Sequence, residues 1–109
     1  MKAFSITPDL VFARFGSTVT VELYRDDSLV GKVSGLDAVQ LGALKRAFAN
    51  CETVAVRGDS DKVSVDPVDD TGFFDVTVSG EETEVTCDER EVALVVLDEL
   101  ILKTARMGE

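Results

Sequence analysis

Apolar and polar residues alternate with a period of two along several segments of this chain. The segments are residues 18–24, 53–57, 62–66, 74–79 and 84–87. Successive side chains of a β-strand point to opposite faces, so each segment is predicted to be a strand with one apolar and one solvated face. Strands of this kind are typical of antiparallel sheets that have one face in water.

Short polar segments rich in aspartate and glycine separate these strands. They are residues 25–28, 58–61, 69–72 and 79–81. Aspartate hydrogen-bonds to nearby backbone and glycine adopts positive φ without strain, so each segment is predicted to be a turn.

Two segments change to a helical period. Ser34 followed by Asp37 resembles a capping box and predicts a helix that runs to about Ala49. Asp88 followed by Glu91 predicts a second helix that runs to about residue 105. Shifting the first helix by 53 positions aligns its apolar residues with those of the second, a match that any two core helices would partly share.

The predicted order is strands, helix, four strands, helix. One-faced strands need an apolar cover, which two helices supply. We therefore predict a single α+β domain over residues 1–109, a two-layer sandwich with a curved antiparallel sheet of about six to seven strands and two helices on one face.

Acidic residues outnumber basic ones by 21 to 11, and the formal charge is −10. A protein with this net negative charge is repelled by nucleic acid and by anionic membranes. The excess of acidic residues therefore favours a basic protein partner or a salty solvent. The chain has no apolar stretch of the ~18 residues that a membrane helix needs. It also begins without a secretion signal, which predicts a cytoplasmic protein.

Catalytic and metal-binding patterns are missing from the sequence. The chain has no histidine, no glycine-rich phosphate loop and no nucleophile elbow, so we predict neither an enzyme nor a cofactor. Cys51 and Cys87 have no second ligand pair and are predicted to be buried free thiols, with a disulfide as the alternative. The aspartates between residues 59 and 70 are interpreted as turn formers and not as a metal site.

The outward positions of the predicted strands form a surface of threonine, serine and carboxylates. Its candidate partner-binding residues are Glu22, Asp75, Glu82 and Glu84. Carboxylates on a flat face could stand in for nucleic-acid phosphates, although a solvated sheet face has a similar composition for reasons of solubility alone.

The second predicted helix is apolar on more than one side. Val95 and Leu102 are seven residues apart, hence nearly in line, and lie beside Asp98 and Glu99 on the side away from the core. A helix with such a stripe is either buried twice or binds a partner, so these four residues are further partner-binding candidates.

Residues 10–15 carry apolar side chains on both faces of a predicted strand. Leu10 and Phe12 are candidates for an edge-strand interface in a homodimer. The alternative is that the N-terminal segment covers this strand and buries both side chains.

Three hypotheses of function follow. The first is a small, non-catalytic regulatory protein that occupies a basic surface of a partner protein, in its sharper form an inhibitor that mimics nucleic-acid charge, of the anti-nuclease or anti-CRISPR type. The second is a structural or homo-oligomeric domain whose acidity reflects adaptation to high salt. The third is a small-molecule-binding domain, in which Tyr24, Arg57 and Phe73 are the residues of interest.

Overall fold

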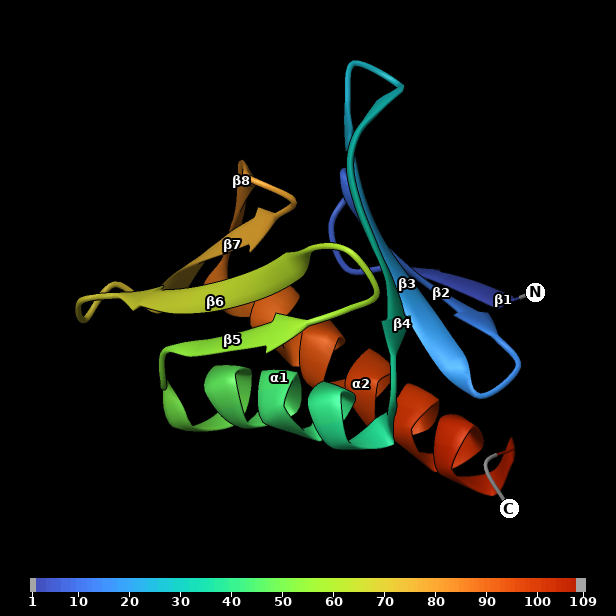
Figure 1. Cartoon of the computed structure of the whole chain (residues 1–109). Coiled ribbons are helices and arrows are strands. Elements are labelled where there is room, and N and C mark those ends of the chain that lie inside the picture. The colour runs from blue at the N-terminus through green and yellow to red at the C-terminus, as the bar shows by residue number, and fades with distance from the viewer. Residues whose placement is uncertain (1, 108–109) are drawn as a thin grey trace.

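The computed structural model describes the backbone of residues 2–107 and the side chains of residues 3–105. It contains two four-stranded antiparallel sheets and two helices (Figure 1). Sheet A has the order β1-β2-β3-β4 and sheet B the order β5-β6-β7-β8. The strands are β1 (Lys2–Ser5), β2 (Leu10–Phe15), β3 (Thr18–Arg25), β4 (Ser28–Leu36), β5 (Val54–Arg57), β6 (Lys62–Val68), β7 (Phe73–Val78) and β8 (Glu81–Val85), and the helices are α1 (Ala38–Asn50) and α2 (Cys87–Met107).

The prediction of an α+β fold with antiparallel strands is confirmed, whereas the prediction of one sheet of six to seven strands is wrong. Each strand pairs with its neighbour in sequence up to β4, and the pairing starts again at β5. The break lies at α1. This helix follows β4 after a single residue, Asp37, and the next strand, β5, pairs with β6 and with no strand of sheet A. Alternation within a strand specifies its two faces but not its neighbours, so it could not reveal this division.

The tight turns lie where the sequence predicts them. Asp26 and Asp27 both have positive φ, 52° and 65°, and Ser79 and Gly80 have 53° and 86°. Two consecutive residues of positive φ are characteristic of type I′ turns, whose twist suits a two-residue hairpin. Aspartate and glycine tolerate this conformation better than most residues, which explains Asp26, Asp27 and Gly80.

Both helices begin with a capping box, but at residues other than those predicted. The side chain of Asp37 accepts a hydrogen bond from the backbone of Gln40, and the Gln40 side chain accepts one from the Asp37 backbone. Thr86 and Glu89 form the same reciprocal pair at α2. Ser34 belongs to β4 and Asp88 to the first turn of α2, so the predicted N-caps are wrong by two or three residues.

The capping boxes show how the two halves of the chain correspond. Asp37 and Thr86 are 49 positions apart, not the 53 suggested by the apolar pattern, and the difference of four is about one helical turn. Each half is four strands followed by a helix, and each helix packs against the other half. Helix α1 contacts β5 and β6 of sheet B, whereas α2 runs beneath sheet A and contacts β3 (Figure 1).

The two helices also pack against each other. The guanidinium of Arg90, in the first turn of α2, donates hydrogen bonds to the carbonyl oxygens of Phe48 (2.7 Å) and Ala49 (3.3 Å) at the end of α1. A cation at this position satisfies carbonyls that the helix itself leaves free and opposes the negative end of its dipole. The helices are therefore antiparallel and joined at one end by Arg90.

Glycines allow β4 to cross sheet B closely. A Cβ atom on Gly31 would lie 2.5 Å from the carbonyl oxygen of Val78 in β7, and one on Gly58 would overlap the carbonyl oxygen of Ser34 in β4. The backbone N–H of Asp59 donates to that same Ser34 oxygen at 2.8 Å. The two sheets thus meet backbone to backbone, and side chains larger than hydrogen are excluded there.

Leu10 and Phe12 belong to the core and not to an interface. Strand β2 lies between β1 and β3, and the two side chains are 0% and 2% exposed. The N-terminal strand β1 covers the edge that a homodimer would have used, so the prediction of an edge-strand interface at these two residues is wrong.

The cysteines are free, but the prediction that they are buried is wrong. Cys51 is the left-handed C-cap of α1 and Cys87 is the first residue of α2, and both are exposed. The chain leaves its strand before Cys87, so the alternation that placed this residue in the core had already ended.

Candidate functional site

The outward side of α2 carries exposed apolar side chains. Val92 is 43% exposed, Val95 is 70% exposed and Leu102 is 50% exposed. The core side of the helix is formed by other residues, namely Ala93, Val96, Leu97 and Leu100. A helix that packs on its core side and still exposes branched apolar side chains has a second face available for contact.

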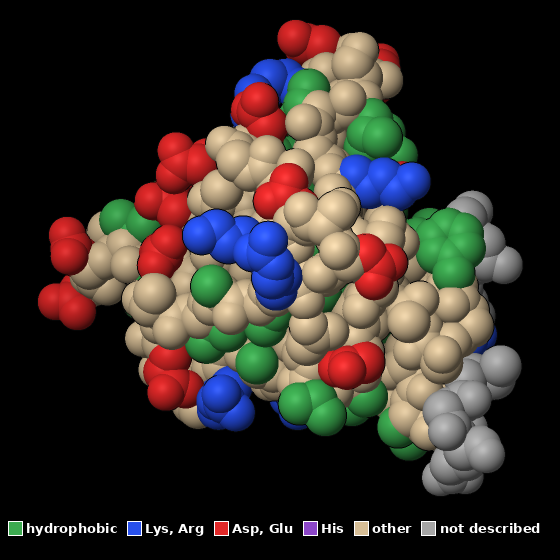
Figure 2. Space-filling model, in the orientation of Figure 1, with side chains coloured by type: hydrophobic (Ala, Val, Ile, Leu, Met, Phe, Trp, Pro, Cys, Tyr) green, Lys and Arg blue, Asp and Glu red, His purple; other side chains and the backbone are tan. Residues whose placement is uncertain are grey.

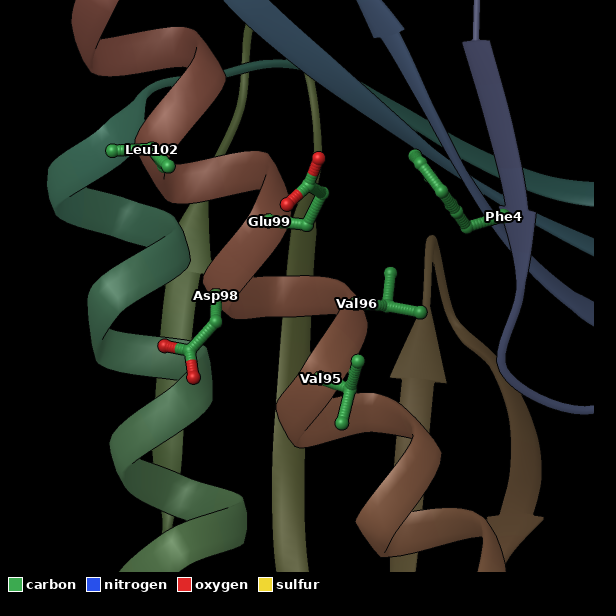
Figure 3. A pocket seen from close by; sticks show the side chains of 6 residues that line it. All are labelled: Phe4, Val95, Val96, Asp98, Glu99 and Leu102. Atoms are coloured by element: carbon green, nitrogen blue, oxygen red, sulfur yellow. The ribbon is translucent and has the colours of Figure 1, made fainter.

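A hollow of about 510 Å³ lies between this side of α2 and strand β1 (Figure 3). We call it the α2–β1 hollow, and it is lined by Phe4, Val95, Val96, Asp98, Glu99 and Leu102. Figure 3 shows Phe4 pointing from β1 toward α2, with Val96 facing it. Four of the six lining side chains are apolar, and both polar ones are carboxylates.

Phe4 was not recognised from the sequence. Strand β1 has only four residues, too few for alternation to be visible, and Phe4 reaches α2 because it pairs with Phe12 of β2. That register places Phe4 on the core face of sheet A, where it extends the apolar surface beyond α2. The position of Phe4 depends on residues distant in the sequence. The only local indication was an apolar side chain in a short segment that begins with Lys2 and ends with Ser5.

The carboxylates of the hollow form only exposed ion pairs within the chain. Asp98 pairs with Lys45 of α1, and Glu99 pairs with Lys103 one turn along α2 at 3.4 Å. Exposed pairs of this kind contribute about 0–1 kcal/mol each, because water and salt screen them. An incoming cation could therefore replace either lysine at little cost.

Strand β1 is an open edge of sheet A. Within the described residues it pairs with β2 on one side and with no strand on the other. Strand β8, an edge of sheet B, carries Glu81, Glu82 and Glu84, and charges on an edge discourage further pairing. Strand β1 has the sequence Lys-Ala-Phe-Ser and lacks such a row of carboxylates.

The predicted acidic residues of the sheets lie apart from this hollow. Glu22 is on the outward face of sheet A, and its carboxylate accepts a hydrogen bond from the Tyr24 hydroxyl at 3.2 Å. Asp75, Glu82 and Glu84 are on the outward face of sheet B, opposite the valines that face the core. The structure therefore brings Val95, Asp98, Glu99 and Leu102 together as predicted from the helical pattern, and leaves the four sheet carboxylates on other surfaces.

One row of carboxylates crosses three strands of sheet B. Asp66 of β6 is opposite Asp75 of β7, and Asp75 is opposite Glu84 of β8. We call these three residues the acidic row; among the described side chains none of them forms an ion pair. Like charges directly opposite one another reduce sheet stability. Figure 2 shows further carboxylates at the margin of the molecule, including the tip of the β6–β7 hairpin.

Two titrating groups are shifted by their neighbours. The hydrogen bond from the Ser79 hydroxyl, together with the backbone N–H of Lys62, lowers the pKa of Asp61, and the nearby positive charge of Arg57 acts in the same direction. Burial, and then the charge and hydrogen bond of Glu22, raise the pKa of Tyr24. The hydrogen bond of Asp61 joins two turns, that of Tyr24 lies within β3, and neither group lies at the α2–β1 hollow.

The described part of the chain contains no group of three or more histidine, cysteine or acidic side chains placed to hold a metal ion. Neither α1 nor α2, the helices of residues 2–107, is long and apolar enough to cross a membrane. No family model, curated protein or solved structure matches the chain. Function is therefore inferred from the surfaces themselves.

Proposed function

We propose that this protein is a non-catalytic binding protein that docks a basic segment of a partner protein on the surface formed by α2 and β1. The observation that carries the proposal is the α2–β1 hollow, an apolar concavity whose polar members are both acidic. Apolar contact supplies the affinity in such a site, and carboxylates at its rim select lysine and arginine. Asp98 and Glu99 would repel the same residues of a second copy, which favours a partner of opposite charge.

Replacing Val95 and Leu102 together by aspartate is expected to weaken binding of a basic apolar peptide about tenfold or more, since burying each side chain contributes roughly 1.5–3 kcal/mol. The probe is an amphipathic peptide of leucine and lysine, and the measurement is fluorescence anisotropy of the labelled peptide. Both residues are exposed, so the double variant should fold normally, which circular dichroism checks.

Val39→Asp provides the matched control. Val39 is 82% exposed at the start of α1 and does not line the α2–β1 hollow. This variant introduces one negative charge at an exposed valine outside the hollow and should not weaken binding. A response to overall charge alone would strengthen binding of this cationic peptide in both variants, and an equal loss in both would show that the peptide does not contact the hollow specifically; either result would refute docking there.

The acidic row favours a second candidate function, mimicry of nucleic-acid charge. Asp66, Asp75 and Glu84 repel one another on an open sheet face, an arrangement that costs stability without an internal partner. A basic surface that normally binds phosphates would relieve that repulsion. In this form the protein would be an inhibitor of a nucleic-acid-binding protein, and cytoplasmic location remains part of the prediction.

Salt dependence separates both binding proposals from adaptation to a salty solvent. We expect the protein to be folded in dilute buffer, and its free energy of unfolding to rise with KCl and level off near 1 M, where the Debye length is about 3 Å. Urea unfolding at several salt concentrations measures this. A chain that folds only in molar salt would instead assign the charge of −10 to its solvent and remove the reason to seek a basic partner.

A further inference from the structure

We infer that the occupant of the α2–β1 hollow is an extended segment of a basic partner protein, which adds to sheet A as a strand beside β1. The inference rests on the proposed function and specifies how the partner binds. Its basis is that the open edge of sheet A and the apolar hollow share one residue, Phe4.

The backbone of β1 supplies the first half of the site. Beyond β2, strand β1 has no neighbour among residues 2–107, so the outward N–H and C=O groups between Lys2 and Ser5 have no strand partner. A strand placed about 4.8 Å further out would pair with them in the same way that β2 pairs on the other side. Partners that bind by strand addition gain much of their affinity from such main-chain hydrogen bonds.

Side chains supply the second half. Alternate residues of an added strand would lie on the same face of the sheet as Phe4, which is the face turned toward α2. They would therefore enter the space bounded by Val95, Val96 and Leu102. A segment with apolar residues at every second position fills that space, and its lysines or arginines reach Asp98 and Glu99.

Strand β8, one of the two edges of sheet B, offers no comparable site. It carries three glutamates, whereas β1 carries one charged residue, Lys2. A helix lying on α2 alone would cover Val95 and Leu102 but would leave the β1 edge unpaired. An added strand would pair with the β1 edge and also cover the apolar side chains of α2.

The test compares two peptides of identical composition, each with equal numbers of leucine and lysine and about 18 residues long, above the ~12–15 residues below which an isolated helix is marginal. One alternates leucine and lysine, and in the other the leucines are spaced three and four apart. We expect the alternating peptide to bind about tenfold more tightly. We also expect it to protect the amide hydrogens of β1 from exchange.

N-methylation of the alternating peptide gives the decisive readout. Successive N–H groups of a strand point to opposite edges, so methylating one alternate set should abolish pairing with β1, and methylating the other set should leave affinity within about twofold. Tighter binding of the helical-period peptide, or equal effects of both methylated sets, would overturn strand addition while preserving the proposed function. Binding of neither peptide, or a dimer formed through β1 without peptide, would refute the basic partner itself.

Discussion

Replacing Phe48 by alanine is expected to lower the free energy of unfolding by about 3–5 kcal/mol. Phe48 is 1% exposed on α1, and its ring packs edge to face against Phe74 of β7 with 5.1 Å between the ring centroids. Removing it leaves a cavity between α1 and sheet B, where the helix of one half covers the sheet of the other. Because small proteins are stable by only about 5–15 kcal/mol, the loss should bring the variant near unfolding.

Urea unfolding followed by circular dichroism measures this loss. Phe15→Ala is the control, because Phe15 is 50% exposed at the end of β2 and its truncation should change stability by about 0.5 kcal/mol or less. The same ring is removed in both variants, so the difference isolates burial. If Phe48→Ala were as stable as Phe15→Ala, α1 would not hold sheet B in solution as described.

The local parts of this fold could be predicted, since their causes are local. Period-two alternation identified β3, β5, β6 and β7 but only the last two residues of β8, and aspartate and glycine identified the turns at residues 26–27 and 79–80. The helices were found, but their N-caps were placed two or three residues away because several serines, threonines and aspartates compete near each end. Capping depends on which hydroxyl or carboxylate meets the free N–H groups, and periodicity does not decide that.

The non-local parts could not be predicted. The apolar pattern of β4 and β5 is compatible with one sheet of eight strands and with two sheets of four, because either arrangement buries the same apolar face of each strand. Gly58 was predicted to be a turn residue and Gly31 was assigned no role, although both mark the crossing between the sheets. A glycine required by close approach has the same sequence signature as one required by a turn.

The candidate site also has one part that could be predicted from the sequence and one part that could not. Val95 and Leu102 could be found from the helical pattern alone, since both lie on one helix and their spacing is enough to place them on its outer side. Phe4 could not be found, because its place in the hollow depends on β1 pairing with β2 and on α2 passing beneath sheet A. Four of the six residues that line the hollow therefore came from local spacing, whereas Phe4 depends on contacts between residues more than ninety positions apart.

Replacing Gly31 by alanine is expected to lower the free energy of unfolding by about 1–3 kcal/mol, although it adds a single methyl group. The new Cβ would lie 2.5 Å from the carbonyl oxygen of Val78, well inside van der Waals contact. That oxygen belongs to the backbone of β7, which is paired on both sides, so it cannot move aside as a flexible side chain would. Sheet A would have to shift away from sheet B.

Gly42→Ala is the matched control for this substitution. Gly42 lies within α1, a Cβ there would meet no atom within 4 Å beyond the helix's own neighbouring backbone, and alanine is favoured over glycine in a helix by up to about 1 kcal/mol. The same change should therefore stabilise the protein at position 42 and destabilise it at position 31, as thermal unfolding of both variants will show. Stabilisation by both would mean that β4 does not cross β7 at this distance, and the two-sheet arrangement would need revision at that point.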